Sequence, residues 1–261
     1  MATYPKMYNL GSATEALIKP SRKKVKPLSP DELGNLKNVI EAKRAEQPAK
    51  VKSAEKPEVK RDKPFVFIGI PCYKTIHIRT MDSIVITMLQ YHPNIDFGFR
   101  SGVFVHENQN DLVETAKMKR ASHLFLVEHD NVFPSDTLEK LLELDKDVVS
   151  APYSGRALPL EPLVYDQSKM NDELYQMSYD RWPDKPTRVY GVPTGCTLIK
   201  MSVFDKIEKP YFFFEYNKEG KMEMSQDIYF SKKVNEANME CWIRPDIEVI
   251  HIGEADFVYK K

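Results

Sequence analysis

The sequence predicts an α/β domain with a mostly parallel sheet flanked by helices, and three observations support this fold class. From residue 64 onward, short apolar, β-rich runs alternate with stretches of helical spacing, which is typical of βαβ units. The run LFLV at 124–127 is continuously apolar, as expected of a strand buried on both faces. With 261 residues and 42% hydrophobic content, the chain can also fill a sizeable core.

The first half of the predicted domain, 64–261, contains the clearest elements. The segment FVFIGIP at 65–71 is apolar and β-rich and ends in a turn signal, so it predicts the first strand. Ser135 is expected to cap the helix that follows the 124–127 strand. The other elements expected here are a helix at 79–90, a strand at 96–105, helices at 110–121 and 135–144, and a strand at 147–151.

The second half is less regular. Six prolines between 152 and 193 predict a long irregular stretch, and long loops in compact domains often carry function. The segment GCTLIKMSVFDKI then predicts a strand followed by a short helix. After it we expect a mobile segment around 216–224, a helix at 226–237 and a last strand near 240–252.

Residues 1–63 differ from the rest of the chain in composition. They carry 15 Lys and Arg against 8 Asp and Glu, whereas 64–261 carries 23 against 30, so the net charge of zero hides a basic tail. Rich in Lys, Pro, Glu and Ala, this tail is predicted to be largely disordered. A capping-box pattern at Ser29 predicts one helix at 30–46, whose apolar stripe can dock on the domain or on a partner.

Cysteine usage and hydropathy indicate the compartment. Cys72, Cys196 and Cys241 are odd in number and form no CxxC pair, which favours neither a disulfide framework nor a structural zinc site. No signal-peptide pattern and no apolar run long enough to span a membrane is present. The sequence therefore predicts a cytoplasmic protein without a membrane span.

Two acids follow the apolar run at 124–127. Glu128 and Asp130 are one residue apart, at the position where the strand is expected to end. Open α/β sheets place their ligands at the carboxyl ends of strands. Because two neighbouring carboxylates repel each other unless a cation or a proton lies between them, this pair predicts a divalent metal site.

Several short motifs occur in a characteristic order. They are IGIPCY, VEHDNVFPSDTLEKLL, TGCTLIKMSVF, SQDIYF and IRPDIEVIHIG, which together extend from Phe65 to Gly253. In this order they resemble the nucleotide-sugar glycosyltransferases of the GT-A fold, especially the family-two-like group common in bacteria and phages. The resemblance implies a single Rossmann-like sheet, a nucleotide-diphosphate sugar as donor and, if a phage encodes the protein, the host cytoplasm as its location.

The resemblance assigns the metal ligands and the diphosphate contacts. In this family a D-x-D motif holds Mg²⁺ or Mn²⁺ against the donor diphosphate, and Asp130 matches its second acid while Glu128 departs conservatively from the first. His251 matches a late histidine that often completes the metal site, and an imidazole ligand favours Mn²⁺ over Mg²⁺. Taken without the resemblance, a histidine after an apolar strand is more often a packed structural residue than a metal ligand. Arg156 is the candidate contact to the diphosphate.

The resemblance also assigns a base and the sugar and nucleotide contacts. Asp227 matches the general base of inverting members, although it would also suit the first turn of a helix for electrostatic reasons, and the preceding glutamate is replaced by glutamine. Pro71 and Tyr73 match a turn that receives the nucleotide base. Gly195 matches a small residue where the backbone approaches the sugar. Cys196 has no accompanying base and is not expected to be a nucleophile.

Two other functions stay open. One is a degenerate GT-A domain that only binds nucleotide sugars or glycans, and the substituted motif residues are the reason to consider it. The other is a nucleotidyltransferase, although IGIPCYK lacks the expected Gly-rich phosphate loop. The acceptor also stays open among glycans, lipid-linked sugars, proteins, small molecules and modified DNA, the last because of the basic tail.

Overall fold

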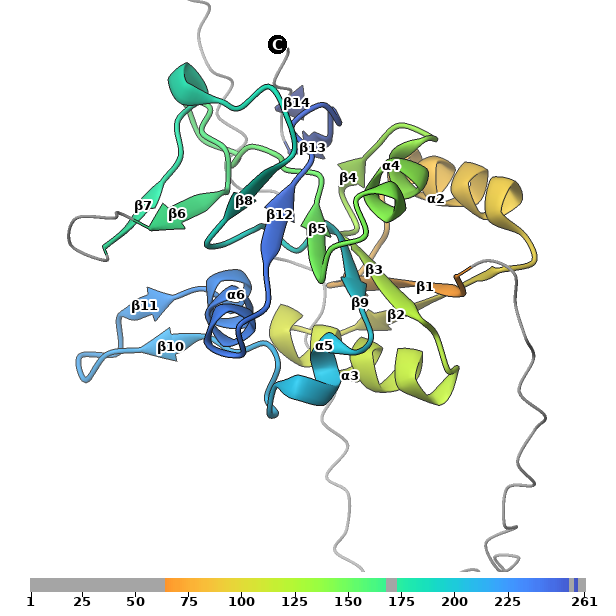
Figure 1. Ribbon diagram of the computed structural model, residues 1–261, viewed down its shortest axis with the longest axis horizontal. Helices are drawn as coiled ribbons and strands as arrows, with labels where there is room; N and C mark the ends of the chain where they lie inside the picture. The colour runs from red at the N-terminus through yellow and green to blue at the C-terminus, as the bar shows by residue number, and fades with distance from the viewer. Residues whose placement is uncertain (1–63, 168–172, 254–255, 258–261) are drawn as a thin grey trace, which may run out of the picture. The chain divides into compact units, whose positions relative to one another are not determined.

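The computed structural model describes residues 64–167, 173–253 and 256–257. Within them the predicted fold class is confirmed, because a seven-stranded, mostly parallel sheet lies between two layers of helices (Figure 1). The predictions of a disordered tail at 1–63 and of a helix at 30–46 lie outside the described residues. No helix in the described part of the chain is long and apolar enough to cross a membrane.

The central sheet has the strand order β2-β1-β3-β9-β5-β12-β8. Five of its strands run in one direction. Strand β9 pairs antiparallel with β3 and β5, and β8 pairs antiparallel with β12, so these two strands run in the opposite direction. In this order along the sheet the strands are Ile95–Ser101, Val66–Cys72, His123–Val127, Cys196–Lys200, Val148–Ser150, Cys241–Ile243 and Thr187–Val189.

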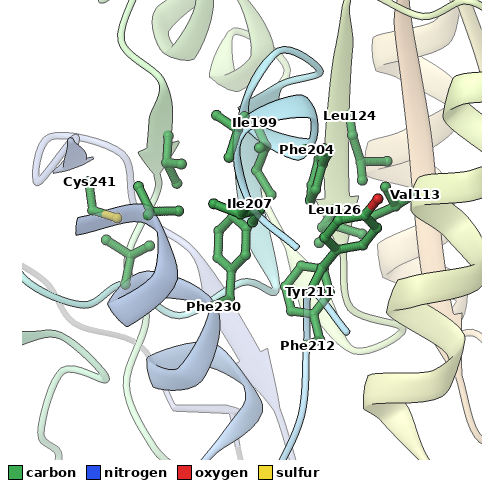
Figure 2. Close-up of a cluster of buried hydrophobic side chains, with 14 of the residues drawn as sticks. Val113, Leu124, Leu126, Ile199, Phe204, Ile207, Tyr211, Phe212, Phe230 and Cys241 are labelled. Carbon is green, nitrogen blue, oxygen red and sulfur yellow. The ribbon is translucent and has the colours of Figure 1, made fainter. Parts of the chain in front are cut away.

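Helices cover both faces of this sheet. On one face Ile84 of α2 (Ile78–Tyr91) and Leu138 of α4 (Thr137–Glu143) pack against alternate strand residues such as Phe125. On the other face α3 (Val105–Met118), α5 (Val203–Lys206) and α6 (Gln226–Glu236) pack against the intervening residues, as Figure 2 shows for Leu124, Leu126, Phe204 and Phe230. The central strands are therefore apolar throughout because both faces are buried.

The described residues also form smaller sheets outside the central one. A three-stranded sheet is formed by β4 (Asn131–Val132), β13 (Ile250–Ile252) and β14 (Asp256–Phe257). Two hairpins are formed by β6 (Tyr165–Gln167) with β7 (Leu174–Gln176), and by β10 (Glu215–Tyr216) with β11 (Met222–Met224). A 3₁₀ turn at Tyr179–Arg181 completes the described elements.

One sequence prediction about the second half was wrong, and for another segment the structure adds the secondary structure. The expected single strand at 240–252 is two strands, β12 and β13, which belong to different sheets because the segment Arg244–Val249 turns between them. The segment around 216–224, expected to be mobile, is the β10–β11 hairpin. Its backbone pairs across a turn in which Asn217 accepts hydrogen bonds from the backbone N–H groups of Glu219 and Lys221.

Three helix and strand boundaries also differ from prediction. Strand β2 ends at Ser101 rather than at 105, and α3 begins at Val105 rather than at 110. The α3 N-cap is Phe104, which makes no side-chain cap bond, so the usual polar signal is missing there. Asn110 instead bonds to the backbone of Tyr211 and Phe212. Helix α4 has Asp136, not Ser135, as its N-cap.

Candidate active site

The acid pair lies at the carboxyl end of β3, in the middle of the sheet. Strand β3 ends at Val127, and the Glu128 N–H donates to the Gly195 carbonyl at 2.8 Å. Asp130 is buried, whereas Glu128 is half-buried. The prediction that both acids follow a central strand is confirmed by this placement.

His251 reaches the acid pair through a second sheet. Strand β13 pairs antiparallel with β4, which sets His251 opposite Asn131, and the Ile252 N–H donates to the Asp130 carbonyl at 2.9 Å. Potential ligand atoms of Glu128, Asp130 and His251 consequently all lie within 4.8 Å of one another. The acid pair predicted from the sequence and the histidine added by the resemblance are therefore brought together.

Hydrogen bonding determines which nitrogen of His251 faces the acids. Its Nδ1 lies 2.9 Å from the Ser154 carbonyl, which can only accept, so Nδ1 carries the hydrogen. Burial lowers the His251 pKa, which favours the neutral ring. The lone pair of Nε2 then points towards the acids, and Nε2 lies 3.8 Å from Asp130 Oδ1.

Two atoms that face each other in this cluster, one from Asp130 and one from His251, show whether its residues suit a cation. Asp130 Oδ1 and His251 Nε2 are both buried, and neither has a hydrogen-bond partner among the described residues. Both can accept but not donate, so they cannot satisfy each other. A divalent ion held by a carboxylate oxygen and a neutral imidazole would satisfy both, and these are suitable ligands for it. The residues therefore fit a metal.

Arg156 also belongs to this cluster. Its guanidinium contacts the other Asp130 oxygen, Oδ2, which places a fixed positive charge beside the acids. His129 Nε2 lies 3.6 Å from the same oxygen. The Arg156 charge thus lies beside Oδ2 of Asp130, while Oδ1 faces His251.

Glu128 is held in an environment that disfavours its charge. Burial, followed by the nearby charges of Asp227 and Asp130, raises its pKa to about 8, and Arg156 opposes this shift. The Tyr153 hydroxyl donates to Glu128 Oε2 at 3.3 Å. Without a cation, Glu128 therefore keeps its proton at neutral pH.

Gly195 allows these side chains to converge. A Cβ at this position would lie 2.3 Å from the Tyr153 hydroxyl, 2.6 Å from Asn131 Nδ2 and 2.9 Å from the Glu128 carboxyl carbon. Its N–H donates to the Tyr153 hydroxyl at 3.1 Å, and its carbonyl accepts from Asn131 Nδ2 at 3.0 Å. Close approach is the reason for glycine here, and the crowded groups belong to this chain.

Asp227 lies in the first turn of α6, close enough to raise the pKa of Glu128. Its Oδ1 accepts hydrogen bonds from the Thr194 hydroxyl and from Gln226 Nε2. Burial raises the Asp227 pKa to about 6, and the bonds from Thr194 and Gln226 oppose that shift. The carboxylate is consequently charged at neutral pH but easily protonated, which suits a general base.

The turn after β1 borders a pocket beside the acids. Pro71 and Tyr73 line it together with Glu128, and the Tyr73 ring is exposed. An exposed aromatic ring beside an apolar wall can stack on a flat ligand. The other lining residues are Cys72, Gly102, Val103, Val105, Asn108 and His129.

The structure also places residues that the sequence predicted to be inert or did not assign to the site. Asn110, where α3 was predicted to begin, and its neighbour Asp111 line a different pocket from the one beside the acids. Burial raises the pKa of the Cys196 thiol, which agrees with its expected inertness. The central residue that the sequence did not single out is Tyr153, whose ring also packs edge-on to His251 at 4.9 Å between centroids. The sequence did contain a signal for Tyr153, because this residue closely follows the strand β5 and therefore lies at the same edge of the sheet as the acids.

No protein-family model matches the chain, and no curated protein does. Among solved structures, the chain is similar to A197 from STIV, with 17% identity and a TM-score of 0.50 over 75% of this chain and 94% of that chain. It is also similar to a "Putative Glucose-1-Phosphate Thymidylyltransferase" from Bacillus anthracis in complex with a sucrose, with 11% identity and a TM-score of 0.40 over 71% and 89% of the two chains. The likeness to A197 shows a shared fold.

Proposed function

We propose that the chain is a metal-dependent glycosyltransferase that moves a sugar from a nucleotide-diphosphate donor to an acceptor hydroxyl with inversion. The observation that carries this proposal is the facing pair of unpartnered atoms, Asp130 Oδ1 and His251 Nε2, at the carboxyl end of a central strand. The GT-A-like sheet and the motif order support it. These features together favour an enzyme over a structural protein.

Asp130, His251 and Glu128 would hold the ion, either Mn²⁺ or Mg²⁺. When bound, it would supply Lewis-acid neutralisation of the diphosphate leaving group. The neutral imidazole of His251 favours Mn²⁺ over Mg²⁺. Because Glu128 has a raised pKa, ion binding would displace its proton and should therefore strengthen as pH rises.

The protein's own groups would position the donor and the acceptor. Tyr73 and Pro71 would receive the base, and Arg156 would contact the diphosphate. Asp227 would take the proton of the acceptor hydroxyl. At the same time the hydroxyl oxygen would bond to the anomeric carbon, and the bond from that carbon to the diphosphate would break. The carbonyl of Gly195 would position two neighbours of the site, because it accepts hydrogen bonds from the Glu128 N–H and from Asn131 Nδ2.

A donor screen tests this function. Wild-type protein with Mn²⁺ and individual nucleotide sugars should bind one donor by calorimetry and release nucleoside diphosphate. Asp130→Asn should remove metal-dependent binding and turnover, while Asp205→Asn, at an exposed position remote from the acids, should leave both unchanged. Equal donor turnover by wild type and Asp130→Asn would refute the proposal.

The same screen separates the two alternative functions. Metal-dependent donor binding with no turnover for any acceptor would indicate a binding module. Release of pyrophosphate from a nucleoside triphosphate and a sugar phosphate would indicate a nucleotidyltransferase. The acceptor is then sought among glycans, lipid-linked sugars, proteins, small molecules and modified DNA with the identified donor.

A further inference from the structure

Three side chains from separate elements form a buried hydrogen-bonded chain next to the acids. Gln109 of α3 contacts Thr194 Oγ1 through its Nε2 at 2.9 Å, and the Thr194 hydroxyl contacts Asp227 Oδ1. Gln109 is fully buried, and Thr194 is 1% exposed. Water is thus kept away from the Gln109–Thr194 bond, and the two side chains depend on each other for hydrogen bonding.

The proton positions along this chain follow from its chemistry. The amide nitrogen of Gln109 can only donate, so Thr194 Oγ1 accepts from it. The single hydroxyl proton of Thr194 is then directed to Asp227 Oδ1, which can accept it. If the Gln109 amide were turned over, its Oε1 would compete for the same proton. The orientation of Gln109 therefore decides whether Thr194 donates to Asp227.

Gln109 occupies a buried position in which one of the two polar atoms of its side-chain amide lacks a hydrogen-bond partner among the described residues. Its Oε1 is buried and has no hydrogen-bond partner among the described residues. An apolar side chain of similar size would avoid this desolvation cost. A buried polar group kept at such a cost calls for a functional reason.

We propose that Gln109 is a positioning residue that, through Thr194, orients the charged carboxylate of Asp227 towards the acceptor hydroxyl. This inference rests on the proposed function, in which Asp227 is the base. Gln109 and Thr194 do not exchange a proton with the substrate. They hold Oδ1 of Asp227 in place so that the carboxylate is ready to receive the proton when the acceptor attacks.

Steady-state kinetics of the full-length chain test the inference. Gln109→Met keeps the length of the side chain and removes the donor, and Thr194→Val removes the hydroxyl. Each should lower kcat about tenfold or more, with the donor KM within about twofold of wild type, because the donor contacts stay in place while the base loses its orientation for proton transfer. Thr194→Ser should restore kcat to within about threefold. The matched control Gln90→Leu, on the exposed surface of α2, should change neither value.

The double variant and a binding assay complete the test. Gln109→Met with Thr194→Val should be no slower than the slower single variant, since both act through one hydrogen bond to Asp227. Wild-type kcat in Gln109→Met, or a raised donor KM at unchanged kcat, would overturn the inference while leaving the glycosyltransferase proposal intact. Loss of metal-dependent donor binding by calorimetry in a folded Gln109→Met would overturn it too, because that result assigns Gln109 to the donor site. Absence of transfer by the wild type would overturn both proposals.

Discussion

Glu128 and Asp227 are two carboxylic acids whose surroundings hold their pKa values at about 8 and about 6. Burial is the largest cause for both. Each group binds a proton more tightly in the folded than in the unfolded chain. Between the unfolded pKa and the folded pKa, the folded state therefore holds more protons, and stability falls as pH rises.

For Glu128 this gives a pH prediction for the metal-free protein. Between about pH 5 and pH 8, the free energy of unfolding of wild type should decrease relative to that of Glu128→Gln, because glutamine cannot titrate. Urea unfolding in the presence of EDTA at several pH values measures the difference. If the free energies of unfolding of wild type and Glu128→Gln change in parallel across this pH range, the raised pKa of Glu128 is contradicted. Added Mn²⁺ should restore wild-type stability at pH 8.

Asp227 gives a prediction about rate. Since a base must be deprotonated, kcat should rise with pH through about 6 and then level off. Asp227→Asn should reduce kcat by about 10²- to 10⁴-fold while donor binding persists. Calorimetry of the folded variant with the donor and Mn²⁺ provides the control. A variant that retains wild-type kcat would show that Asp227 serves only as an acid in the first turn of α6.

His251 gives a prediction about metal preference. His251→Ala should weaken Mn²⁺ affinity by at least about tenfold and weaken Mg²⁺ affinity less, because imidazole suits Mn²⁺ better. Titration of both ions, followed by calorimetry, measures the ratio. His92→Ala, at an exposed position after α2, is the matched control. Unchanged preference in His251→Ala would assign the residue a purely structural role against Tyr153.

At the scale of elements, the site depends on the junction before β9. Gly195→Ala should destabilise the protein by about 1–3 kcal/mol, because its Cβ would overlap Tyr153, Asn131 and Glu128 and the buried groups would have to shift. Metal binding should weaken as well. Gly155→Ala is the control, since its Cβ meets only Leu163 Cδ2 at an ordinary 3.6 Å and should change stability by less than about 0.5 kcal/mol. Chemical unfolding measures both, and equal stabilities would contradict the crowding argument.

The elements also show where sequence prediction succeeds. Helix α2 and strand β3 were predicted nearly to the residue because each has a continuous local pattern, amphipathic in one and fully apolar in the other. The start of α3 was missed because Phe104 supplies no polar cap. The 240–252 segment was assigned to one strand because its apolar residues continue through the turn, while the change of sheet depends on distant pairing partners.

At the scale of the whole molecule, the predicted boundary at residue 63 gives a further test. Removal of residues 1–61 should change the melting temperature by less than about 2 °C, because the segment is poor in aromatic residues and rich in charge. Differential scanning calorimetry of the two proteins measures this. A larger loss would show that the segment belongs to the folded domain.

The same truncation addresses the basic tail. If modified DNA is the acceptor, the full chain should bind duplex DNA with an affinity that falls steeply with salt, and the truncated chain should lose that dependence. Fluorescence anisotropy at several salt concentrations separates the two. Identical DNA binding by both proteins would exclude a role for the tail.

The sequence alone determined the α/β class, the alternation of strands and helices, and the position of Glu128 and Asp130 after a buried strand. Each of these follows from local periodicity and from where an apolar run stops. The family resemblance added His251 and Asp227 as candidates, but it supplied no contact for either.

Only the tertiary structure decided how these candidates meet. The β13–β4 pairing places His251 Nε2 opposite Asp130 Oδ1, and the packing of α3 against the loop before β9 places Gln109 on Thr194. Such contacts join residues far apart in the chain, and their register depends on which strands pair and which faces are buried. No local pattern encodes them, and the same holds for the burial that raises the pKa values of Glu128 and Asp227.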